Sequence, residues 1–428
     1  MDSDHPLDIL RARGFLHEAT DETALRNLMD DGPITFYVGF DPTAPSLHIG
    51  HLMGMMAMAW LQRSGHRALA VAGGGTGRIG DPSDRDEERE LLGDDQIAGN
   101  LEGIRSQLAR VLDLDDPRRG LLLDNYEWLG GLGFIEFLRD VGKHFSVNQM
   151  IARESVKRRL TEREQGISFT EFSYTLLQAY DFAHLHAEEN CMLQLGGSDQ
   201  WGNIVAGIDL TRRMHGPQTY GLVWPLVERS DGRKFSKSTG EAIWLDPDLT
   251  SPYAFYQWFL NIPDADAPGF LRWFTFLPLD AIEQLERQSA GDPAGRAAQK
   301  ALASEITRIV HGEDGLEAAI AATTVLFGGE RFSGLDDRTL ADAFDSAPSV
   351  ELPNTDLDDG IGILSLMTAT GAAKSNSEAR RLIEQGGASL NNERIEDSDR
   401  VIGPGDLASA TSLVLRVGKK RYYLARFI

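Results

Sequence analysis

The chain has 428 residues, with 42 lysines and arginines against 65 aspartates and glutamates, which gives a formal net charge of −23. Its length predicts about two to four domains, and 42% hydrophobic with 25% charged residues is typical of a folded protein and argues against intrinsic disorder. A charge this negative argues at first against a nucleic-acid partner. The charge is uneven, however, because residues 361–428 hold ten basic and seven acidic residues, a net of +3, and the rest carries −26. A partner that binds this basic end, RNA included, is therefore not excluded.

Cys191 is the only cysteine, so the chain can form neither an intramolecular disulfide nor a zinc site of several cysteines. Its simplest interpretation is a small buried apolar residue. The acidic start lacks the apolar core of a signal peptide. The longest apolar run, near residues 53–61, is far shorter than the roughly 20 residues of a membrane-spanning helix. We therefore expect a cytoplasmic, reducing location and no membrane partner.

Strand-like and helical stretches alternate over the first 247 residues. Residues 1–32 have helical periodicity. Apolar runs typical of buried strands occupy residues 34–40, 68–72, 121–128, 191–197 and 219–225. Helical stretches follow them at residues 47–63, 97–113, 131–142 and from Ser198. This alternation predicts an α/β fold with a parallel sheet and helices on both faces.

The pattern changes after residue 247. The strand signal disappears, and four stretches look helical, at residues 250–261, 279–290, 295–312 and 314–325. Residues 342–360 contain prolines, glycine and six acidic residues without lysine or arginine, a composition typical of a linker. We therefore predict a catalytic α/β domain at 1–247, a helical domain at 248–341, a linker at 342–360 and a small αβ domain at 361–428.

Two histidines lie at a predicted helix start, after the strand that ends near Phe40. Ser46 is a candidate N-cap, and His48 and His51 fall on one face of the first turns. Gly50 removes a side chain where a flat group could approach the backbone. Imidazoles beside the N–H groups of a helix N-terminus suit a polyphosphate. The alternatives are two surface histidines or a metal site, for which no third ligand is indicated.

A second candidate, residues 229–242, contains Lys234 and Lys237 among glycines and small hydroxyl residues. Such a loop could close its ammonium groups over phosphates, or it could be a solvated basic turn. A third pattern, GxGxxG at residues 75–80, could indicate a dinucleotide-binding oxidoreductase. That interpretation also needs a helix that opens at once and an acidic residue on a second strand. Neither follows here, so we reject it.

The histidine and lysine motifs together match a known signature. His48-Ile49-Gly50-His51 and Lys234-Phe235-Ser236-Lys237-Ser238 correspond to the HIGH and KMSKS motifs of class I aminoacyl-tRNA synthetases, which have a Rossmann-like fold. With YVGFDPTAPSLHIGH, GGGTGRIGDPS, TEFSYTLLQAYDF and LGGSDQWGNI in the same order, nearly the whole chain resembles the bacterial tyrosyl-tRNA synthetases. The resemblance implies that ATP activates L-tyrosine to tyrosyl-adenylate, and that the tyrosyl group is then transferred to the 3′ end of tRNA(Tyr).

The resemblance also implies roles for individual residues. The catalytic residues would be Thr43, His48, His51, Lys234, Lys237, Arg85 and Arg89. The family commonly has lysine at position 85, and both arginines could instead form a solvated charged face. ATP would be bound by Gly39, Asp41, His48, Gly50, His51, Gly197, Asp199, Lys234 and Lys237. Tyr37 and Asp181 would bond the tyrosine hydroxyl, Asp81, Tyr174 and Gln178 its ammonium group, and Gln200 the carboxylate side.

The tail resembles the S4 RNA-binding domain over residues 362–397, and the helical domain would then be of the anticodon-binding type. The tRNA-binding residues would be Lys374, Arg380, Arg381, Arg394, Lys419, Lys420 and Arg421. The family also implies a homodimer, and Mg²⁺ that arrives with ATP, without dedicated protein ligands. Three alternatives remain: a tryptophanyl-tRNA synthetase, a catalytically silent RNA-binding protein, and another HxGH nucleotidyltransferase.

Overall fold

The computed structural model describes residues 5–81, 93–151, 156–157, 167–226, 242–327, 331–332, 334–345, 347–418 and 421–428. They form two compact units, Met1–Asp246 with Ile262–Val310, and Pro247–Asn261 with His311–Ile428. The segment 248–341 thus contributes to both units, and the three-domain division remains a prediction. No helix among the described residues is long and apolar enough to cross a membrane.

The first unit is built on a sheet with the strand order β1-β6-β5-β2-β3-β4. The strands are β1 (Glu18–Ala19), β2 (Thr35–Phe40), β3 (Arg67–Ala72), β4 (Gly120–Asp124), β5 (Cys191–Gly197) and β6 (Tyr220–Trp224). Strands β2 to β6 pair in parallel, and the short β1 pairs antiparallel with β6. The predicted Rossmann-like parallel sheet is confirmed, with β1 as an unpredicted edge strand.

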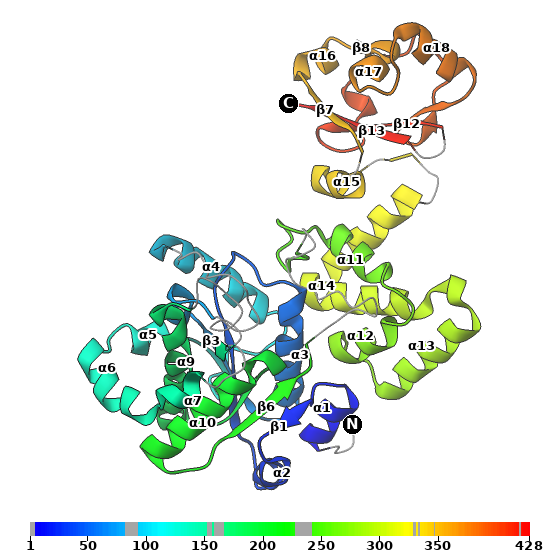
Figure 1. The fold of residues 1–428 in the computed structure, drawn as a ribbon. Helices are drawn as coiled ribbons and strands as arrows, with labels where there is room; N and C mark the ends of the chain where they lie inside the picture. The colour runs from blue at the N-terminus through cyan, green and yellow to red at the C-terminus, as the bar shows by residue number, and fades with distance from the viewer. Residues whose placement is uncertain are drawn as a thin grey trace. The chain divides into compact units, whose positions relative to one another are not determined.

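Helices cover both faces of this sheet (Figure 1). The helices of this unit include α1 (Pro6–Ala12), α2 (Glu22–Asp30), α3 (Ile49–Arg63), α4 (Asp94–Leu108), α5 (Tyr126–Leu129), α6 (Phe134–Asp140), α7 (Val147–Ile151), α9 (Phe169–Glu189), α10 (Trp201–His215), α12 (Ala267–Phe274) and α13 (Leu279–Gly291). Because side chains alternate along a strand, Tyr37 packs with Phe182 of α9, whereas its neighbour Val38 faces Gly54 of α3. Strand β2 is therefore covered by α9 on one face of the sheet and by α3 on the other.

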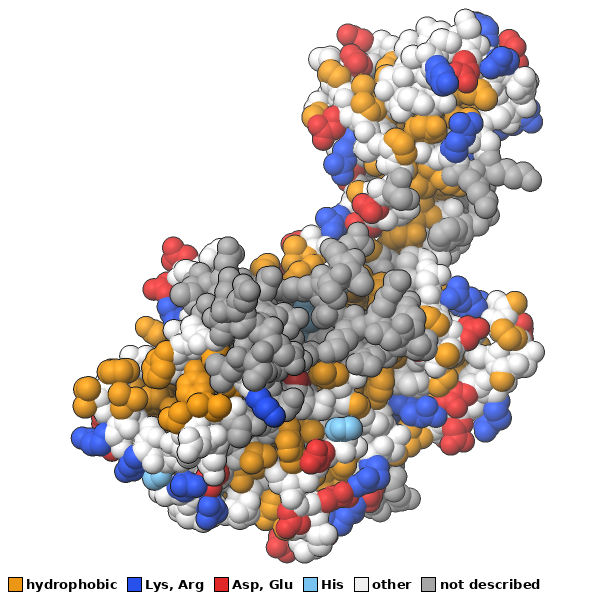
Figure 2. All heavy atoms as spheres, in the orientation of Figure 1, with side chains coloured by type: hydrophobic (Ala, Val, Ile, Leu, Met, Phe, Trp, Pro, Cys, Tyr) orange, Lys and Arg blue, Asp and Glu red, His pale blue; other side chains and the backbone are white. Residues whose placement is uncertain are grey.

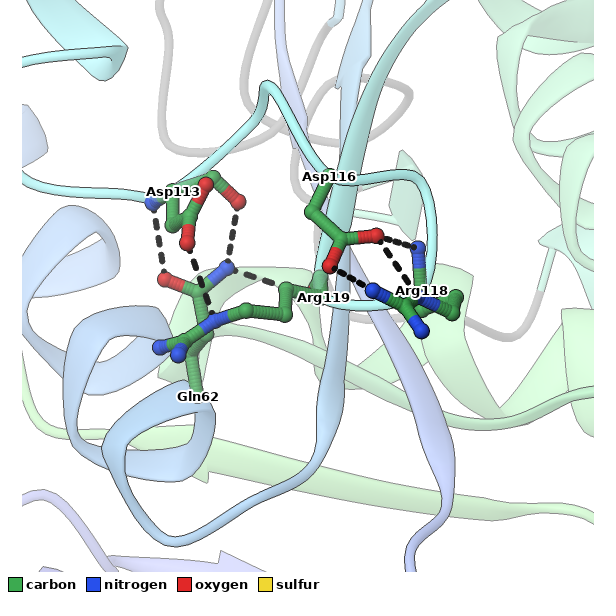
Figure 3. A network of polar contacts seen from close by, with 5 residues as sticks. All are labelled: Gln62, Asp113, Asp116, Arg118 and Arg119. Atoms are coloured by element: carbon green, nitrogen blue, oxygen red, sulfur yellow. Dashed lines mark hydrogen bonds and ion pairs between the residues drawn. The ribbon is translucent and has the colours of Figure 1, made fainter.

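The end of α3 is fastened to the chain before β4 by a buried glutamine. Gln62 donates to the carbonyl oxygens of Asp113 (2.8 Å) and Arg119 (3.1 Å), and accepts from the amide of Asp113 (2.9 Å). Arg119 also pairs with Asp113, while Asp116 pairs with Arg118 (Figure 3). A buried amide with all these groups satisfied orients the helix against β4. It thereby fixes the histidine-bearing start of α3.

The second unit contains a sheet of order β10-β9-β12-β13-β7 and the antiparallel pair β11-β8. Its strands are β7 (Ser349–Leu352), β8 (Ile361–Gly362), β9 (Ala388–Leu390), β10 (Glu393–Arg394), β11 (Val401–Ile402), β12 (Ser412–Val417) and β13 (Arg421–Phe427). Its helices are α11 (Pro252–Leu260), α15 (Asp337–Ala343), α16 (Asn354–Asp358), α17 (Ile363–Ala369) and α18 (Asn376–Glu384). Helix α14 (Ala297–Phe327) runs from one unit into the other, with a non-helical Gly312 inside it.

Part of the stretch that its composition predicts as a linker is ordered. Residues 349–352 form β7, which pairs in parallel with residues 424–427 of the last strand. Leu357 of α16 is buried in the core of this unit. Pairing with a strand some 70 residues away cannot be read from local composition. Its acidic residues Glu351, Asp356, Asp358 and Asp359 are exposed, while Leu357 anchors the stretch in the core.

Candidate active site

Within the described ranges, the residues predicted to bind tyrosine and ATP lie near the carboxyl ends of the parallel strands, where ligands bind in open α/β sheets. Asp41 follows β2, the glycine tract 73–75 follows β3, and Asn125 follows β4. Residues 198–200 follow β5 as a single 3₁₀ turn, η3. Hydrogen bonds link the segments after β2, β3 and β4, whereas Gln200 after β5 bonds Asp81 and Gln178 of α9. The sheet topology therefore brings together residues that are far apart in the sequence.

His48, and not Ser46, is the N-cap of α3. Its Nδ1 accepts from the amide of Gly50 (3.1 Å), and Nδ1 of His51 accepts from the amide of His48 (3.1 Å). The centroids of the two imidazole rings lie 4.1 Å apart. Because each Nδ1 accepts, Nε2 is the nitrogen that carries the hydrogen in each neutral ring. The predicted cap, Ser46, is buried and bonds Leu47, Gln107 and Asp246 instead.

Gly50 makes room for the His48 ring. A Cβ at position 50 would lie 2.8 Å from Cε1 and 3.1 Å from Nδ1 of His48. Beside this ring, the chain of residues 47–49 pairs antiparallel with residues 243–245, through Ile49 N to Ile243 O (3.0 Å) and Leu245 N to Leu47 O (2.9 Å). The segment that directly follows the predicted lysine loop is thus attached to the HIGH motif.

Four predicted catalytic residues, Lys234, Lys237, Arg85 and Arg89, lie outside the described residues. Thr43 is half-buried in the turn after β2, where its amide donates to Asp41 O (2.8 Å). Helix α4 supports this turn, because Asn100 donates to Pro42 O (2.8 Å) and Gln107 accepts from the amide of Leu47 (2.7 Å). The turn therefore has a fixed position between β2 and α3.

Tyr37 and Asp181 form a buried pair beneath the strand ends. Tyr37 is 2% exposed and Asp181 is 3% exposed. The Tyr37 hydroxyl has no hydrogen-bond partner within the described ranges. Burial, and then the negative charge of Asp181, raise the pKa of Tyr37 well above its usual value. A buried hydroxyl without a partner is costly, so this atom is available to a hydrogen-bonding group of a ligand.

Asp181 has two partners that the sequence did not reveal. Asn125 Nδ2 donates to Oδ2 (2.9 Å), and Trp128 Nε1 donates to Oδ1 (2.7 Å). Burial raises the pKa of Asp181 to about 7, although these two hydrogen bonds lower it. The only sign of Asn125 and Trp128 in the sequence was their position in DNYEW, at the end of a predicted strand. That strand was predicted to continue to residue 128, whereas β4 ends at Asp124.

A chain of hydrogen bonds connects this carboxylate with Tyr174 on α9. Asn125 Nδ2 also donates to Thr76 Oγ1 (3.0 Å), and Thr76 donates to Asp41 Oδ1 (2.8 Å). Tyr174 donates to the other oxygen, Asp41 Oδ2 (3.0 Å). Two predicted residues of the α9 stripe, Tyr174 and Asp181, thus face a single polar network.

The remaining predicted tyrosine residues form a second cluster. Gln178 Nε2 donates to Gln200 Oε1 (3.3 Å), and Gln200 Nε2 donates to Asp81 (2.8 Å) and Asp199 (3.0 Å). Asn203 joins this cluster through Gln200 Oε1 (3.4 Å). The buried Gln178 Oε1 has no partner among the residues that the structure describes. The cluster holds carboxylates and amides able to receive an ammonium group.

The predicted ATP-binding glycines differ in their surroundings. Gly39 is exposed, and a Cβ there would meet no atom within 4 Å. Gly197 is buried, and a Cβ there would lie 2.4 Å from Asp199 Oδ1. The first therefore leaves the strand end open to a flat group, and the second lets Asp199 fold back over its own turn.

The predicted RNA-binding residues Lys374, Arg380, Arg381, Arg394 and Arg421 are exposed, and Lys419 and Lys420 lie outside the described residues. Helix α18 begins at Asn376, capped by Ser375, whose side chain accepts from the amide of Glu378. Arg380 bonds Ser398 (2.7 Å) and Asp399 (3.2 Å). The described basic side chains thus lie on the helix and strands of one small unit.

Comparison with known proteins agrees with this geometry. Residues 29–328 match the family of class I tRNA synthetases (W and Y), and residues 339–425 match the SYY-like C-terminal domain of tyrosine–tRNA ligases. The chain is 49% identical to a tyrosine–tRNA ligase of Roseiflexus castenholzii, over 99% of both chains, and 48% identical to one of Acidothermus cellulolyticus, over 97% of both.

Among solved structures, the chain is similar to a C-terminally truncated mitochondrial tyrosyl-tRNA synthetase of Aspergillus nidulans. The TM-score is 0.69 at 31% identity, over 76% of this chain and 95% of that one. A tryptophanyl-tRNA synthetase of Encephalitozoon cuniculi shares the fold, with a TM-score of 0.55 at 15% identity, over 73% of this chain and 90% of that one.

The fold and the full-length relatives define the class of protein first: the chain is a class I aminoacyl-tRNA synthetase of the tryptophan and tyrosine group. Within that class, it belongs to the tyrosine–tRNA ligase family. The alternatives of a tryptophanyl enzyme, a catalytically silent protein and another HxGH nucleotidyltransferase are therefore set aside.

Proposed function

We propose that this enzyme activates L-tyrosine with ATP and transfers the tyrosyl group to tRNA(Tyr) through the residues identified from the sequence. One observation carries the tyrosine specificity. The Tyr37 hydroxyl, which has no partner among the described residues, and the carboxylate of Asp181 are both buried on the α9 face of the sheet. A phenol both donates and accepts, and so matches this pair; a phenylalanine side chain would leave the Tyr37 hydroxyl unsatisfied.

Activation needs alignment and charge stabilisation from the protein. The attacking group is the tyrosine carboxylate, which is already ionised at neutral pH, so no protein nucleophile is required. Thr43, His48 and His51 would donate to the phosphates as charge develops in the transition state. Lys234, Lys237, Arg85 and Arg89 would bind the leaving pyrophosphate. The pairing of residues 243–245 with 47–49 supports the lysine roles, since it attaches the end of that loop to the HIGH motif.

The two substrates would then meet over the strand ends. The adenosine side of ATP would be bound by Gly39, Asp41, Gly50, Gly197 and Asp199. The ammonium group of tyrosine would be bound by Asp81, Tyr174 and Gln178, and Gln200 would lie on the side of its carboxylate. The buried Gln178 oxygen without a partner in the described part of the chain supports this assignment, because an ammonium group would satisfy it.

Recognition of tRNA would use the S4-like C-terminal domain. The predicted arginines Arg380, Arg381, Arg394 and Arg421 are exposed, and the start of α18 offers backbone N–H groups beside Lys374. The net charge of +3 over residues 361–428, against −26 elsewhere, supports a local basic surface on an acidic protein that otherwise repels RNA. Deletion of residues 361–428 should abolish tRNA charging and leave adenylate formation intact; unchanged charging would exclude this role.

A homodimer is supported by an apolar surface on α6, α7 and the start of α9. Its side chains are strongly exposed: Phe134 67%, Ile135 73%, Val147 57%, Ile151 42% and Phe169 70%. Figure 2 shows hydrophobic side chains gathered over the region of α5 and α6. Exposed apolar side chains gathered in this way are typical of a protein interface. Ile135→Asp should give a monomer by analytical ultracentrifugation, and an unchanged dimer would exclude this face.

Magnesium would arrive bound to the nucleotide phosphates. Within the described residues no three His, Cys, Asp or Glu side chains are grouped to hold a metal ion, so no step is assigned to a protein-held ion. A reducing, cytoplasmic location completes the proposal and is supported by the single cysteine, Cys191, which is buried.

The decisive experiment is tyrosine-dependent ATP–pyrophosphate exchange, with each of the other amino acids as a comparison. Exchange with another amino acid and none with tyrosine would overturn the proposed specificity. Lys237→Ala should strongly depress exchange with little change in tyrosine affinity. Lys300→Ala, an exposed lysine of α14, is the matched control. A large loss of tyrosine affinity in Lys237→Ala would contradict the assigned role.

A further inference from the structure

Trp244 lies directly opposite His48 in the short antiparallel pairing of residues 243–245 with residues 47–49. The two hydrogen bonds of this pairing, at 3.0 and 2.9 Å, are made by the residues that flank His48 and Trp244. A pair flanked in this way is the closely spaced kind, with Cα atoms about 4.5 Å apart and both side chains on one face. The backbone therefore brings the indole of Trp244 to the imidazole of His48.

A buried serine and a buried glutamine hold this pairing in place. The amide of Asp246 donates to Ser46 Oγ (3.1 Å). Gln107 of α4 accepts from the amide of Leu47 (2.7 Å), and its Oε1 lies within hydrogen-bond distance of Ser46 Oγ (3.3 Å). Both Ser46 and Gln107 are buried. The backbone of Trp244 is thus fixed relative to the turn that precedes α3.

The hydrogen bond at Nδ1 does not by itself fix the His48 ring. The torsion about the Cβ–Cγ bond of histidine is broad, so a ring that accepts from the amide of Gly50 (3.1 Å) can still rotate. Contacts with neighbouring rings restrict it. The His51 ring lies 4.1 Å away between centroids, and the indole of Trp244 lies 5.9 Å away at 71° between the planes. This edge-to-face contact with the indole is attractive and opposes rotation of the imidazole.

We propose that Trp244 is a positioning residue for tyrosine activation, which holds the His48 ring so that its Nε2–H is directed at the phosphates of ATP. The inference rests on the proposed role of His48 as a phosphate donor. Trp244 acts through that ring and lies outside the HIGH and KMSKS motifs. Because charge on the phosphates grows in the transition state, a misdirected donor weakens the transition state more than the bound substrates.

The experiment is a double-mutant cycle in the full-length enzyme, measured by single-turnover adenylate formation. Trp244→Leu removes the aromatic ring and keeps an apolar side chain. His48→Asn removes the imidazole, and asparagine is itself a preferred N-cap, so the start of α3 keeps its cap. Trp244→Leu is compared in the wild-type and the His48→Asn backgrounds. Tyrosine affinity and thermal unfolding are measured for every variant.

In the wild-type background, Trp244→Leu should lower the maximum rate on the order of tenfold. The tyrosine affinity and the half-saturating ATP concentration should stay within about twofold, as expected when an interaction of the transition state is lost. In His48→Asn the same change should cost less than about twofold, because no imidazole remains to be positioned. Trp244→Phe keeps a smaller aromatic ring and should lose less than Trp244→Leu. The cycle is repeated with it, so the test holds even where the leucine variant does not fold.

Trp258→Leu is the matched control, since the half-buried indole of Trp258 on α11 also makes an edge-to-face contact, with Phe259 (4.8 Å, 79°). It should leave the maximum rate unchanged in both backgrounds. Equal losses from the Trp244 variants in both backgrounds would show a merely structural role and overturn the inference, as would no loss in either. If His48→Asn alone forms adenylate at the wild-type rate, the proposed role of His48 fails instead, so the two failures are distinguishable.

Discussion

Substitution of Gly50 by alanine separates stability from catalysis at the HIGH motif. The added Cβ would lie 2.8 Å from Cε1 of His48, whereas carbon atoms in favourable contact are about 3.5–4.0 Å apart. The His48 ring must therefore move by roughly 0.7 Å or more. Such a shift breaks the hydrogen bond from the amide of Gly50 to Nδ1 and displaces Nε2 from its place at the helix start.

The two effects on stability nearly cancel. Loss of the His48 cap costs about 1 kcal/mol, and replacement of a helical glycine by alanine contributes up to about 1 kcal/mol of helix propensity. Catalysis has no such compensation, because a misplaced phosphate donor costs on the order of 10- to 100-fold in rate. We therefore expect Gly50→Ala to unfold close to the wild-type temperature and to activate tyrosine 10- to 100-fold more slowly.

The assay is single-turnover adenylate formation, with thermal unfolding followed in parallel. Gly99→Ala in α4 is the matched control, since a Cβ there meets no atom within 4 Å. It should gain the helix propensity without a loss of activity. If Gly50→Ala forms adenylate at the rate of Gly99→Ala, the contact between position 50 and His48 has no catalytic role, and the reasoning fails.

Two further predictions concern buried charges. Arg13 is 4% exposed and donates to the carbonyl oxygens of residues 272, 275 and 277. Urea titration should therefore show that Arg13→Leu lowers the free energy of unfolding by about 3 kcal/mol. Arg11 is exposed, so Arg11→Leu should lower it by less than about 1 kcal/mol. The pKa of Asp181 is about 7 in the folded protein, above its ordinary value of 3.8. Between about pH 4 and pH 7 the folded state therefore binds a proton that the unfolded state has lost. The free energy of unfolding should fall as the pH rises through this range, by at most about 1.4 kcal/mol per pH unit. Asp181→Asn should flatten that slope, and an unchanged slope would assign it to other groups.

The sheet and the helical stripe of α9 were predictable because each follows from a local pattern. Strands buried on both faces read as continuous apolar runs, and the runs at residues 34–40, 68–72 and 191–197 lie within one residue of β2, β3 and β5. Helical spacing likewise placed Tyr174 and Asp181 on one face of a helix. Both patterns depend only on neighbours in the sequence.

The cap of α3 and the strand β7 were not predictable, because distant partners decide them. Ser46 has the residue type of an N-cap, but Gln107 and the amide of Asp246 engage its hydroxyl, and His48 takes the capping position. Residues 349–352 become a strand through pairing with the last strand of the chain. Local propensity is a weak guide where tertiary contacts compete for the same groups.

The glycine tract after β3 shows how one residue type serves different sites. In a dinucleotide-binding fold, glycines let the backbone approach a pyrophosphate. Here a Cβ on Gly73 would lie 2.1 Å from Asp41 Oδ1, and one on Gly74 would lie 2.2 Å from Asp124 Oδ1. The tract continues into a short 3₁₀ turn, Thr76–Arg78, and not into a helix. These glycines therefore admit the protein's own carboxylates, and with the amides of Gly75 and Thr76 they orient Asn125 toward Asp181. The side chains opposite the glycines, and not the spacing among the glycines, therefore decide whether such a tract receives a pyrophosphate or the protein's own carboxylates.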